Sequence, residues 1–277
     1  MERRILKIIH EALHEDIGKG DITTQATVRS RKKGSALAIA KDDFIIAGLY
    51  IFEATFKCLD KNIRVKKLMK DGCRAKKGDV IAEVSGSLAG ILQAERVSLN
   101  LFQRMCGIAT QTAKYVKAVA GTKTIILDTR KTVPGLRILD KMAVCIGGAS
   151  NHRIGLYDGV LIKDNHIQAA GGITAAGMAQ RKHLSRAMAI EVETENLSEV
   201  KEALHCDVEI IMLDNMSIPA MKKAVDFVAG RALLEASGNV NLQNVASIAA
   251  TGVDFISVGE LTHSVRAADI SLKITAC

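Results

Sequence analysis

The second half of the chain constrains the fold most, because six short apolar runs recur there with helical segments between them. The runs are TIIL (124–127), GVLI (159–162), AIEVE (189–193), EIIML (209–213), ALLEA (232–236) and DFISV (254–258). Continuous apolar runs of this length indicate parallel strands that are buried on both faces. Six strand–helix units in succession favour an α/β barrel, complete or partial. The alternative is an open doubly wound sheet, although no G-x-G-x-x-G segment follows the first strand.

The first half of the chain has a different pattern of apolar residues. Residues 1–16 have the pattern of an amphipathic helix, and residues 34–86 have a strand-like pattern interrupted by the turn-forming segment DGCRAKKGD (71–79). A long helical pattern follows from Leu88 to Ala120, and Gly107 predicts a break within it. The two patterns indicate an α/β protein with two differently built parts.

Composition limits the classes of function. The net charge of +8 suggests nucleic-acid binding, but the basic residues are spread along the chain and only 3% of residues are aromatic. A pocket for acidic metabolites is therefore the better interpretation, with nucleic acid as the alternative. We expect no membrane partner, because no apolar run approaches the roughly 18 residues of a membrane span.

The cysteines carry no sign of a disulfide framework or a zinc site. None forms a C-x-x-C pair, and all are far apart in the sequence: Cys58, Cys73, Cys106, Cys145, Cys206 and Cys277. The N-terminal segment also lacks the continuous apolar core of a signal peptide. Reduced thiols in a cytoplasmic protein are the expectation.

Polar residues follow each of the six predicted strands. In parallel α/β folds the active site lies at the carboxyl ends of the strands, so these residues are expected to converge on one place. The first two strand ends belong to a segment, 128–166, that is rich in cations: Arg130, Lys131, His152, Arg153 and Lys163. Because burying an unpaired charge is costly, these cations suggest a pocket for a small, multiply anionic substrate.

Acids and glycines complete the predicted site. Glu193 and Asp214 end different strands, and paired carboxylates there could hold Mg²⁺, contact sugar hydroxyls or act as acid and base. Gly238 and Gly259 each stand between a strand and a helix, where backbone N–H groups can bind phosphate. These parts suit a substrate with two carboxylates and a co-substrate with phosphates and a ribose.

With these residues the chain resembles the quinolinate phosphoribosyltransferase family, the type II phosphoribosyltransferases. The segments that carry the resemblance keep the family's order and spacing over nearly the full length: EDIGKGDITT (15–24), ERVSLNLFQRMCGIAT (95–110), LDTRKTVPGLR (127–137), NHRIGLYDGVLIKDNHI (151–167), EVETENLSEV (191–200), IMLDNM (211–216), LEASGNV (234–240) and VGELTHS (258–264). The resemblance implies an N-terminal α/β sandwich domain over residues 1–107 and an incomplete, open parallel α/β barrel over residues 108–277.

The resemblance also implies the reaction and the assembly. Quinolinate and phosphoribosyl pyrophosphate would react with Mg²⁺ as cofactor, giving nicotinate mononucleotide, pyrophosphate and CO2 in de novo NAD synthesis. The protein would be a homodimer with shared active sites, and a hexamer is a possible larger assembly. In each site the N-terminal domain of one subunit would cap the barrel of the other.

The resemblance assigns roles to individual residues. Lys131, Glu193 and Asp214 match catalytic positions, and the two acids also serve Mg²⁺. Quinolinate would be bound by Arg96, which reaches in from the neighbouring subunit, and by Arg130, His152, Arg153 and Lys163. The phosphate would be held by the segments that contain Ser237, Gly238, Asn239 and Gly259.

Two positions depart from the family's pattern. Ala149 stands where the family usually has a third glycine before N-H-R, and Asn239 replaces the second glycine of S-G-G. Asn tolerates positive φ better than most residues, so the phosphate loop is expected to survive. The changes bear on phosphate affinity more than on the reaction.

Three other functions remain as alternatives. A paralogous group linked to molybdenum uptake shares the fold but lacks the L-I-K-D-N-H pattern that is intact here at 161–166. A basic nucleic-acid-binding protein would bind with steep salt dependence and without turnover. A nicotinate or nicotinamide phosphoribosyltransferase would need to hold one carboxylate or none, and the number of cations here favours two.

Overall fold

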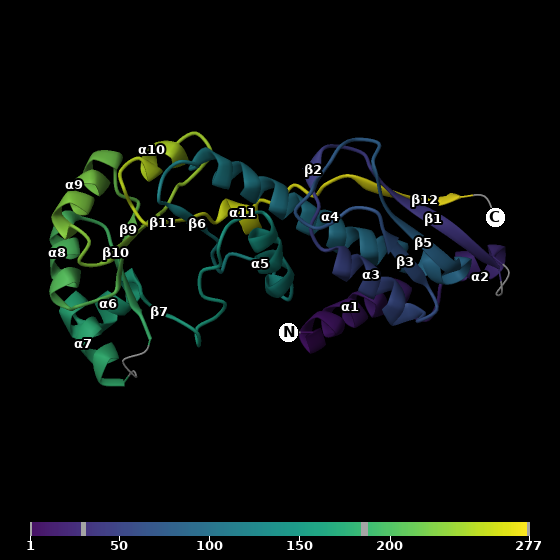
Figure 1. Cartoon of the computed structure of the whole chain (residues 1–277). Coiled ribbons are helices and arrows are strands. Elements are labelled where there is room, and N and C mark those ends of the chain that lie inside the picture. Colours follow the sequence, from purple (N-terminus) through teal and green to yellow (C-terminus); the bar gives the residue numbers. More distant parts are fainter. Residues whose placement is uncertain (1, 29–31, 184–187, 276–277) are drawn as a thin grey trace. The chain divides into compact units, whose positions relative to one another are not determined.

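The computed structural model describes residues 2–28, 32–183 and 188–275 (Figure 1). It divides into two compact units. The first unit contains residues 1–113, 132–148 and 264–277, and the second contains residues 114–131 and 149–263. Each unit is therefore assembled from separate stretches of the chain. The proposed domain boundary after residue 107 stays a prediction.

The second unit is built on a six-stranded parallel sheet. Its strands are β6 (Ile125–Leu127), β7 (Val160–Ile162), β8 (Ile190–Thr194), β9 (Ile210–Asp214), β10 (Leu233–Ser237) and β11 (Phe255–Ser257). Each overlaps one of the six apolar runs of the sequence. The order in the sheet is β6-β11-β10-β9-β8-β7, so successive strands from β7 to β11 are direct neighbours. Such a one-way progression belongs to a barrel, and the doubly wound alternative, which requires a reversal of order, is wrong.

Helices alternate with these strands. They are α6 (Asp164–Ala170), α7 (Ile173–His183), α8 (Leu197–His205), α9 (Ile218–Val228), α10 (Val245–Ala249) and α11 (Glu260–His263). Figure 1 shows α7, α8 and α9 along the outer side of the strands. In the sheet of the described residues, β6 and β7 form the two edges, which confirms the predicted open α/β barrel.

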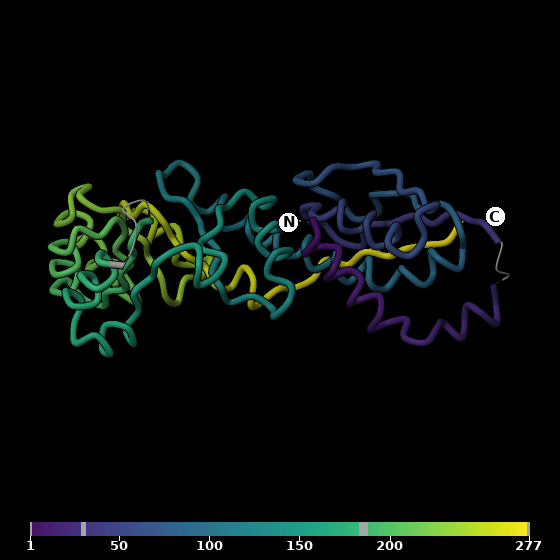
Figure 2. Tube along the Cα trace, turned by 90° about the horizontal axis from the view of Figure 1, so that it is seen from below, coloured from purple at the N-terminus to yellow at the C-terminus, as the bar shows by residue number. Residues whose placement is uncertain are grey.

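The first unit contains a four-stranded antiparallel sheet in the order β12-β1-β5-β3. Its strands are β1 (Lys33–Ala40), β3 (Arg64–Lys67), β5 (Val80–Ser87) and β12 (Ile270–Thr275), and a separate two-stranded ribbon pairs β2 (Phe44–Ile45) with β4 (Arg74–Ala75). The C-terminal strand, yellow in Figure 1 and Figure 2, runs beside β1 and pairs Ala36 with Ile274. The strand β12 thus joins the sheet of the first unit, far in sequence from β1.

The helices of the first unit complete the predicted α/β sandwich. They are α1 (Glu2–Ile17), α2 (Ile22–Thr27), α3 (Leu49–Leu59), α5 (Arg137–Ile146) and the first part of α4 (Leu88–Ala118). Among them, α3 is in contact with β3 and with α1. In α1 the buried residues are Ile5, Ile9 and Leu13, at the helical spacing that the sequence predicted. Phe52, Phe56 and Phe102 form an aromatic cluster in the core, with ring centroids 5.1 and 5.3 Å apart.

The strand-like interpretation of residues 34–86 was wrong for α3. The segment LYIFEATFKCL is apolar on several sides and buries six residues, so its periodicity does not separate a buried helix from a strand. Gly48, with φ of 96°, is the residue that turns the chain into the helix.

The predicted break at Gly107 was also wrong, because α4 runs without interruption from Leu88 to Ala118. A Cβ atom at position 107 would lie 2.2 Å from the carbonyl oxygen of Arg266. The glycine therefore serves a close approach between two backbone segments of the first unit, and a helix tolerates it.

Two general features of the sequence have counterparts in the structure. Cys58, Cys73, Cys106, Cys145 and Cys206 are free thiols, as predicted, and Cys277 lies outside the described residues. Across the described ranges, no helix is at once long enough and apolar enough to span a membrane.

Candidate active site

A hollow of about 440 Å³ lies at the carboxyl ends of the second unit's strands. Its lining comes from the segments after β6, β10 and β11: Thr129, Lys131, Ser237, Gly238, Asn239, Val240, Asn241, Ser257, Gly259, Glu260 and His263. All four residues predicted to hold phosphate are in this set, together with Lys131. The sheet thus brings together segments that are more than 100 residues apart in the chain.

The loop after β10 has a conformation that depends on its sequence. Gly238 has φ of 88°, and a Cβ atom there would lie 2.2 Å from Asn215 Oδ1. Asn239 follows with φ of 50°, so a second left-handed residue is required where the family usually has glycine. The Asn239 side chain donates to Asn215 Oδ1 over 2.9 Å. Asn239 therefore fits the loop, and it adds a tie to the end of β9.

Lys131 is held at the edge of the same hollow by its backbone. Its N–H donates to Thr129 Oγ1 over 3.0 Å, and its carbonyl accepts from Thr262 Oγ1 over 2.8 Å. A Cβ atom on Gly259 would lie 3.2 Å from Lys131 Cδ. The backbone of Lys131 is thus fixed, while its long side chain is exposed.

Lys163 and Glu193, predicted as substrate ligand and catalytic acid, form an ion pair. Lys163 Nζ donates to Glu193 Oε2 over 2.8 Å, and only 10% of the Glu193 side chain is exposed. Lys163 is also the N-cap residue of α6, where its backbone N–H donates to His166 Nδ1. A cation at the site therefore has its own carboxylate partner.

The second predicted acid, Asp214, is half-buried at the end of β9. It stands in register with Ser237 of β10 and accepts from Asn215 Nδ2 over 2.7 Å. Because Glu193 and Asp214 end neighbouring strands, they lie on the same edge of the sheet. This is the arrangement that the sequence predicted.

Arg130 and Arg153 supply further positive charge. Burial is the main cause that lowers the pKa of the Arg153 guanidinium, and the charge of Arg130 lowers that pKa further. Arg153 Nη1 donates to the carbonyl oxygen of Gly159 over 3.0 Å. Two guanidinium groups that repel each other favour an anion between or beside them.

His152 has both ring nitrogens engaged by the protein. Nδ1 accepts from the N–H of Arg153 over 2.7 Å, and Nε2 lies 3.0 Å from Glu191 Oε2 and 3.6 Å from Glu235 Oε2. The His152 backbone N–H donates to Asp128 Oδ1 over 2.8 Å. Its predicted contact with the substrate stays a prediction.

Sequence reasoning missed Glu191 and Glu235, which are 4% and 1% exposed. A signal was present, because each is an acid in the interior of a mostly apolar strand, two residues before a predicted site residue. Sequence reasoning also missed Tyr115, a fully buried residue of α4 whose hydroxyl donates to Glu260 Oε2. Burial is the main cause that raises the pKa of Tyr115. Tyr115 thereby orients an acid that lines the hollow.

Arg96 is the one predicted site residue that belongs to the first unit. It is an exposed residue of α4, next to the half-buried Glu95. Burial raises the pKa of the Glu95 carboxyl, and the charge of Arg96 acts in the opposite direction. The role of Arg96 toward quinolinate stays a prediction.

Two sets of residues in the second unit could coordinate a metal ion. Among the described residues, His152, Glu191 and Glu235 form a cluster whose ligand atoms all lie within 4.8 Å of one another. The pair predicted for Mg²⁺, Glu193 and Asp214, is a different set. Magnesium in enzymes commonly takes one or two carboxylates together with substrate phosphates, and this pair fits that requirement, since Asp214 is in register with Ser237 of the hollow.

Comparisons with known proteins agree with this architecture. The model of the quinolinate phosphoribosyl transferase N-terminal domain matches residues 21–106, and that of the C-terminal domain matches residues 108–273. The chain belongs to the quinolinate phosphoribosyl transferase family. The family's third glycine before N-H-R is replaced here by Ala149, which is buried and is not among the residues with positive φ. That position therefore does not need glycine for its backbone conformation.

Individual family members are similar over almost the whole chain. The nicotinate-nucleotide pyrophosphorylase [carboxylating] of Arabidopsis thaliana is 46% identical over 96% of this chain and 82% of that protein. The structure of the nicotinate-nucleotide pyrophosphorylase from Francisella tularensis superposes with a TM-score of 0.94 at 41% identity, covering 99% and 97% of the two chains. The corresponding structure from Ehrlichia chaffeensis gives 0.93 at 44% identity, with 97% and 98% covered.

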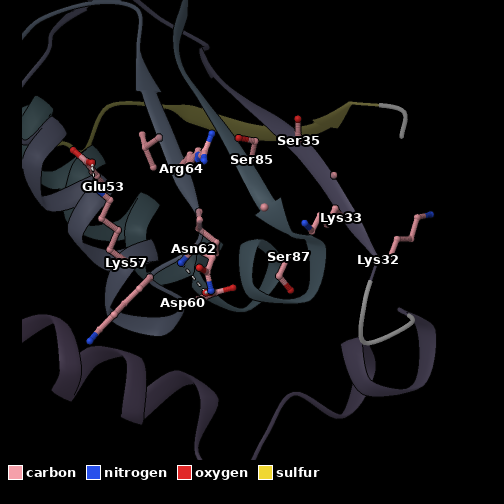
Figure 3. A pocket seen from close by; sticks show the side chains of 15 residues that line it. Lys32, Lys33, Ser35, Glu53, Lys57, Asp60, Asn62, Arg64, Ser85 and Ser87 are labelled. Carbon is pink, nitrogen blue, oxygen red and sulfur yellow. Dashed lines mark hydrogen bonds and ion pairs between the residues drawn. The ribbon is translucent and has the colours of Figure 1, made fainter.

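A larger hollow, of about 1350 Å³, lies in the first unit and contains none of the predicted site residues (Figure 3). Five cations line it, Lys32, Lys33, Lys57, Lys61 and Arg64, together with the acids Glu53 and Asp60. Lys57 pairs with Glu53 over 2.5 Å, which neutralises part of this charge. Size and charge alone therefore do not identify the active site.

Proposed function

We propose that this protein transfers the phosphoribosyl group of phosphoribosyl pyrophosphate to quinolinate with loss of CO2. The products are nicotinate mononucleotide and pyrophosphate, and the reaction is a step of NAD biosynthesis. The observation that carries this proposal is the 46% identity, over 96% of the chain, to a protein named nicotinate-nucleotide pyrophosphorylase [carboxylating]. The cations and the hollow of about 440 Å³ at one edge of the second unit's sheet support it.

Quinolinate is a dianion, and the cations of the second unit suit it. Arg130 and Arg153 can each form two parallel hydrogen bonds to a carboxylate, and Lys163 can neutralise charge as a point cation. His152 stands next to Arg153 as a further proposed substrate ligand, and Arg96 would be supplied by a second copy of the chain. A substrate held by this many fixed cations is positioned for attack, which lowers the entropic part of the barrier.

Phosphoribosyl pyrophosphate would place its phosphates at the loops after β10 and β11. Ser237, Gly238, Asn239 and Gly259 supply backbone N–H groups, a hydroxyl and space for a phosphate there. Glu193 and Asp214 lie on the same sheet edge, where carboxylates can contact ribose hydroxyls. The ribose would then lie between the phosphate loop and the cations.

The chemistry needs charge stabilisation more than a nucleophile from the protein. The bond from the sugar C1 to pyrophosphate breaks as the ring nitrogen of quinolinate forms its bond to C1. The carboxylates of Glu193 and Asp214 stabilise the positive charge that develops on the sugar. Then the carboxyl group at ring position 2 leaves as CO2, its bonding electrons stay on the ring carbon beside the cationic nitrogen, and that carbon takes up a proton. Lys131 would lie near these reacting groups.

Mg²⁺ is proposed as the cofactor, with Glu193 and Asp214 as its protein ligands, in part through water and substrate. When bound, it would neutralise charge on the leaving pyrophosphate. Two carboxylates at neighbouring strand ends, with no third one required, suit an ion that arrives with its phosphate substrate.

The assembly is also a proposal. Residues 1–107 would form the domain that caps the active site of a second copy in a homodimer, with residues 108–277 as the catalytic barrel. A hexamer of three such dimers is the larger assembly we would test for. We propose a cytoplasmic location, and no nucleic acid or membrane as partner.

The test is an assay of the purified protein with quinolinate, phosphoribosyl pyrophosphate and MgCl2. Nicotinate mononucleotide and CO2 are measured together, and nicotinate is offered as a parallel substrate. We expect equimolar products from quinolinate, none from nicotinate, and loss of activity with EDTA that returns with excess Mg²⁺. Lys163→Ala should lose most activity, while Lys222→Ala, an exposed lysine on α9 of the same unit, should retain it. Folded wild-type protein that turns over neither substrate would refute the proposal.

A further inference from the structure

Beneath the candidate site lies a layer of buried charge that the proposed reaction does not use. Glu191 of β8 and Glu235 of β10 are 4% and 1% exposed. Alternate residues of a strand point to the same side, so Glu191 shares a face with Glu193, and Glu235 shares a face with Ser237. The two acids therefore stand one layer deeper than two residues of the proposed site.

Packing does not account for this pair. Burying a carboxylate is costly, and one oxygen of each group, Oε1, is buried without a hydrogen-bond partner in the part of the chain that the structure describes. Two apolar side chains of similar size would fill the same layer at lower cost. Both acids face one imidazole, that of His152, and Glu235 also interacts with Ser257 and Glu191.

The contacts fix the tautomer of that imidazole. Nδ1 accepts the N–H of Arg153 over 2.7 Å, so the ring proton is on Nε2. Nε2 donates to Glu191 Oε2 at 3.0 Å, whereas Glu235 Oε2, at 3.6 Å, is too far for a hydrogen bond. Glu191 is thus the acceptor that sets the ring, and Glu235 lies beside it.

The fixed ring in turn sets Arg153. The backbone N–H of Arg153 is bound by His152, and its Nη1 is bound by the carbonyl of Gly159 at 3.0 Å. A Cβ atom on Gly159 would lie 3.1 Å from Arg153 Cβ, so the Arg153 side chain rests closely on this glycine. Arg153 is therefore held at its backbone N–H and at its guanidinium before any substrate binds.

We propose that Glu191 is a positioning residue that acts through His152 to hold Arg153 in its carboxylate-binding orientation. This inference rests on the proposed function, because quinolinate is the carboxylate in question. Burial, and then the nearby charge of Glu191, raise the pKa of Glu235. Arg153 then pre-exists in its binding geometry, and the substrate does not have to order it.

The first measurement is steady-state kinetics of Glu191→Gln and Glu235→Gln, with KM determined separately for each substrate. We expect Glu191→Gln to raise KM for quinolinate about tenfold, the effect of one hydrogen bond to a charged group, with KM for phosphoribosyl pyrophosphate unchanged. Glu235→Gln changes an acid that lies 3.6 Å from Nε2 and makes no hydrogen bond to the ring, so it should change either KM less than threefold. A general loss of structure would raise KM for quinolinate and KM for phosphoribosyl pyrophosphate in both variants.

The outcomes separate this inference from the proposed function. Wild-type protein without turnover of quinolinate would refute the function. Active wild-type protein with an unchanged Glu191→Gln, or with both KM values raised equally, would refute only the positioning role.

A second measurement does not depend on activity. Long-range 15N–1H spectra of histidine-labelled protein report the tautomer of each imidazole, and His152→Asn identifies the signal. The Nε2–H tautomer is expected at neutral pH, and the Nδ1–H tautomer or an imidazolium would contradict the proposal. Metal analysis after dialysis is the companion control, since one tightly held metal per chain, lost in Glu191→Gln, would replace the hydrogen bonds by coordination.

Discussion

The two hollows of this protein differ in what holds their charged side chains. The hollow of the first unit is about three times larger, 1350 against 440 Å³, and is lined by five cations. Those cations are exposed, and one of them, Lys57, pairs with the half-buried acid Glu53, which also pairs with Lys67 outside the hollow. The hollow of the second unit is formed by tight loops with left-handed backbone, beside arginines and acids supported from beneath. The fixed geometry of the charged side chains, more than their number, therefore distinguishes the binding site.

The largest effect that would sharpen this contrast is expected at Arg153. Arg153→Ala removes a guanidinium held at two points, and we expect kcat/KM for quinolinate to fall about 100-fold or more. Arg64→Ala removes a cation from the hollow of the first unit and should leave kcat/KM unchanged. Steady-state assays of both variants measure kcat/KM. Equal losses in the two variants would contradict the proposed difference between the two hollows.

The phosphate loop provides the next test. Gly238→Ala would bring a Cβ atom against Asn215 and force an alanine to φ of 88°, so KM for phosphoribosyl pyrophosphate should rise about tenfold or more. Gly72→Ala is the matched control, because its φ is 85° and no atom lies within 4 Å of the added Cβ. Gly72→Ala imposes the same backbone strain away from the phosphate loop, so it should leave KM for phosphoribosyl pyrophosphate unchanged. A similar rise of KM in both variants would show that strain alone, away from the loop, affects the site.

The two regions should respond to pH in opposite ways. Burial and Glu191 raise the pKa of Glu235, so the folded state keeps a proton that the unfolded chain releases, and Glu235 costs stability as the pH rises from about 4.5 through neutral. Burial raises the pKa of Glu53, but hydrogen bonds from Lys57 and Lys67 outweigh it and lower that pKa, so its contribution is lost as the pH falls below about 4.5.

Urea unfolding between pH 4 and 9 measures this difference. Glu235→Gln should lose less stability than the wild type toward high pH, and Glu53→Gln should lose less toward low pH. If neither carboxyl changed its protonation on unfolding, the free energy of unfolding would depend on pH in the two variants as it does in the wild type.

The smallest effect is expected at Asn239. Asn239→Gly restores the family's usual residue at a position with φ of 50°, where Asn already fits. Because the gain in loop conformation is offset by the lost tie to Asn215, KM for phosphoribosyl pyrophosphate should change about twofold or less. A large fall in KM would mean that Asn239 limits phosphate binding, contrary to the fit seen in the loop.

Much of the second unit could be predicted, because its signals are local. Each apolar run became a strand within about one residue, since a buried parallel strand is apolar along its whole length. Residues at the strand ends, such as Lys163, Glu193 and Ser237, could be grouped because parallel strands all end at one edge. The first unit was harder to predict, since α3 is apolar on several sides and Gly107 is a helix residue chosen for a contact with Arg266.

The sequence by itself determined the class of fold, the family and the set of charged residues at the strand ends, because periodicity and motif order are properties of the chain alone. Only the tertiary structure decided which charges support which. Glu191, Glu235 and His152 come from separate segments, and an acid buried in a strand acquires a partner from another segment only when the chain folds. Since the energy of a buried charge depends on its neighbours in space, that layer of the protein could not be inferred from neighbours in sequence.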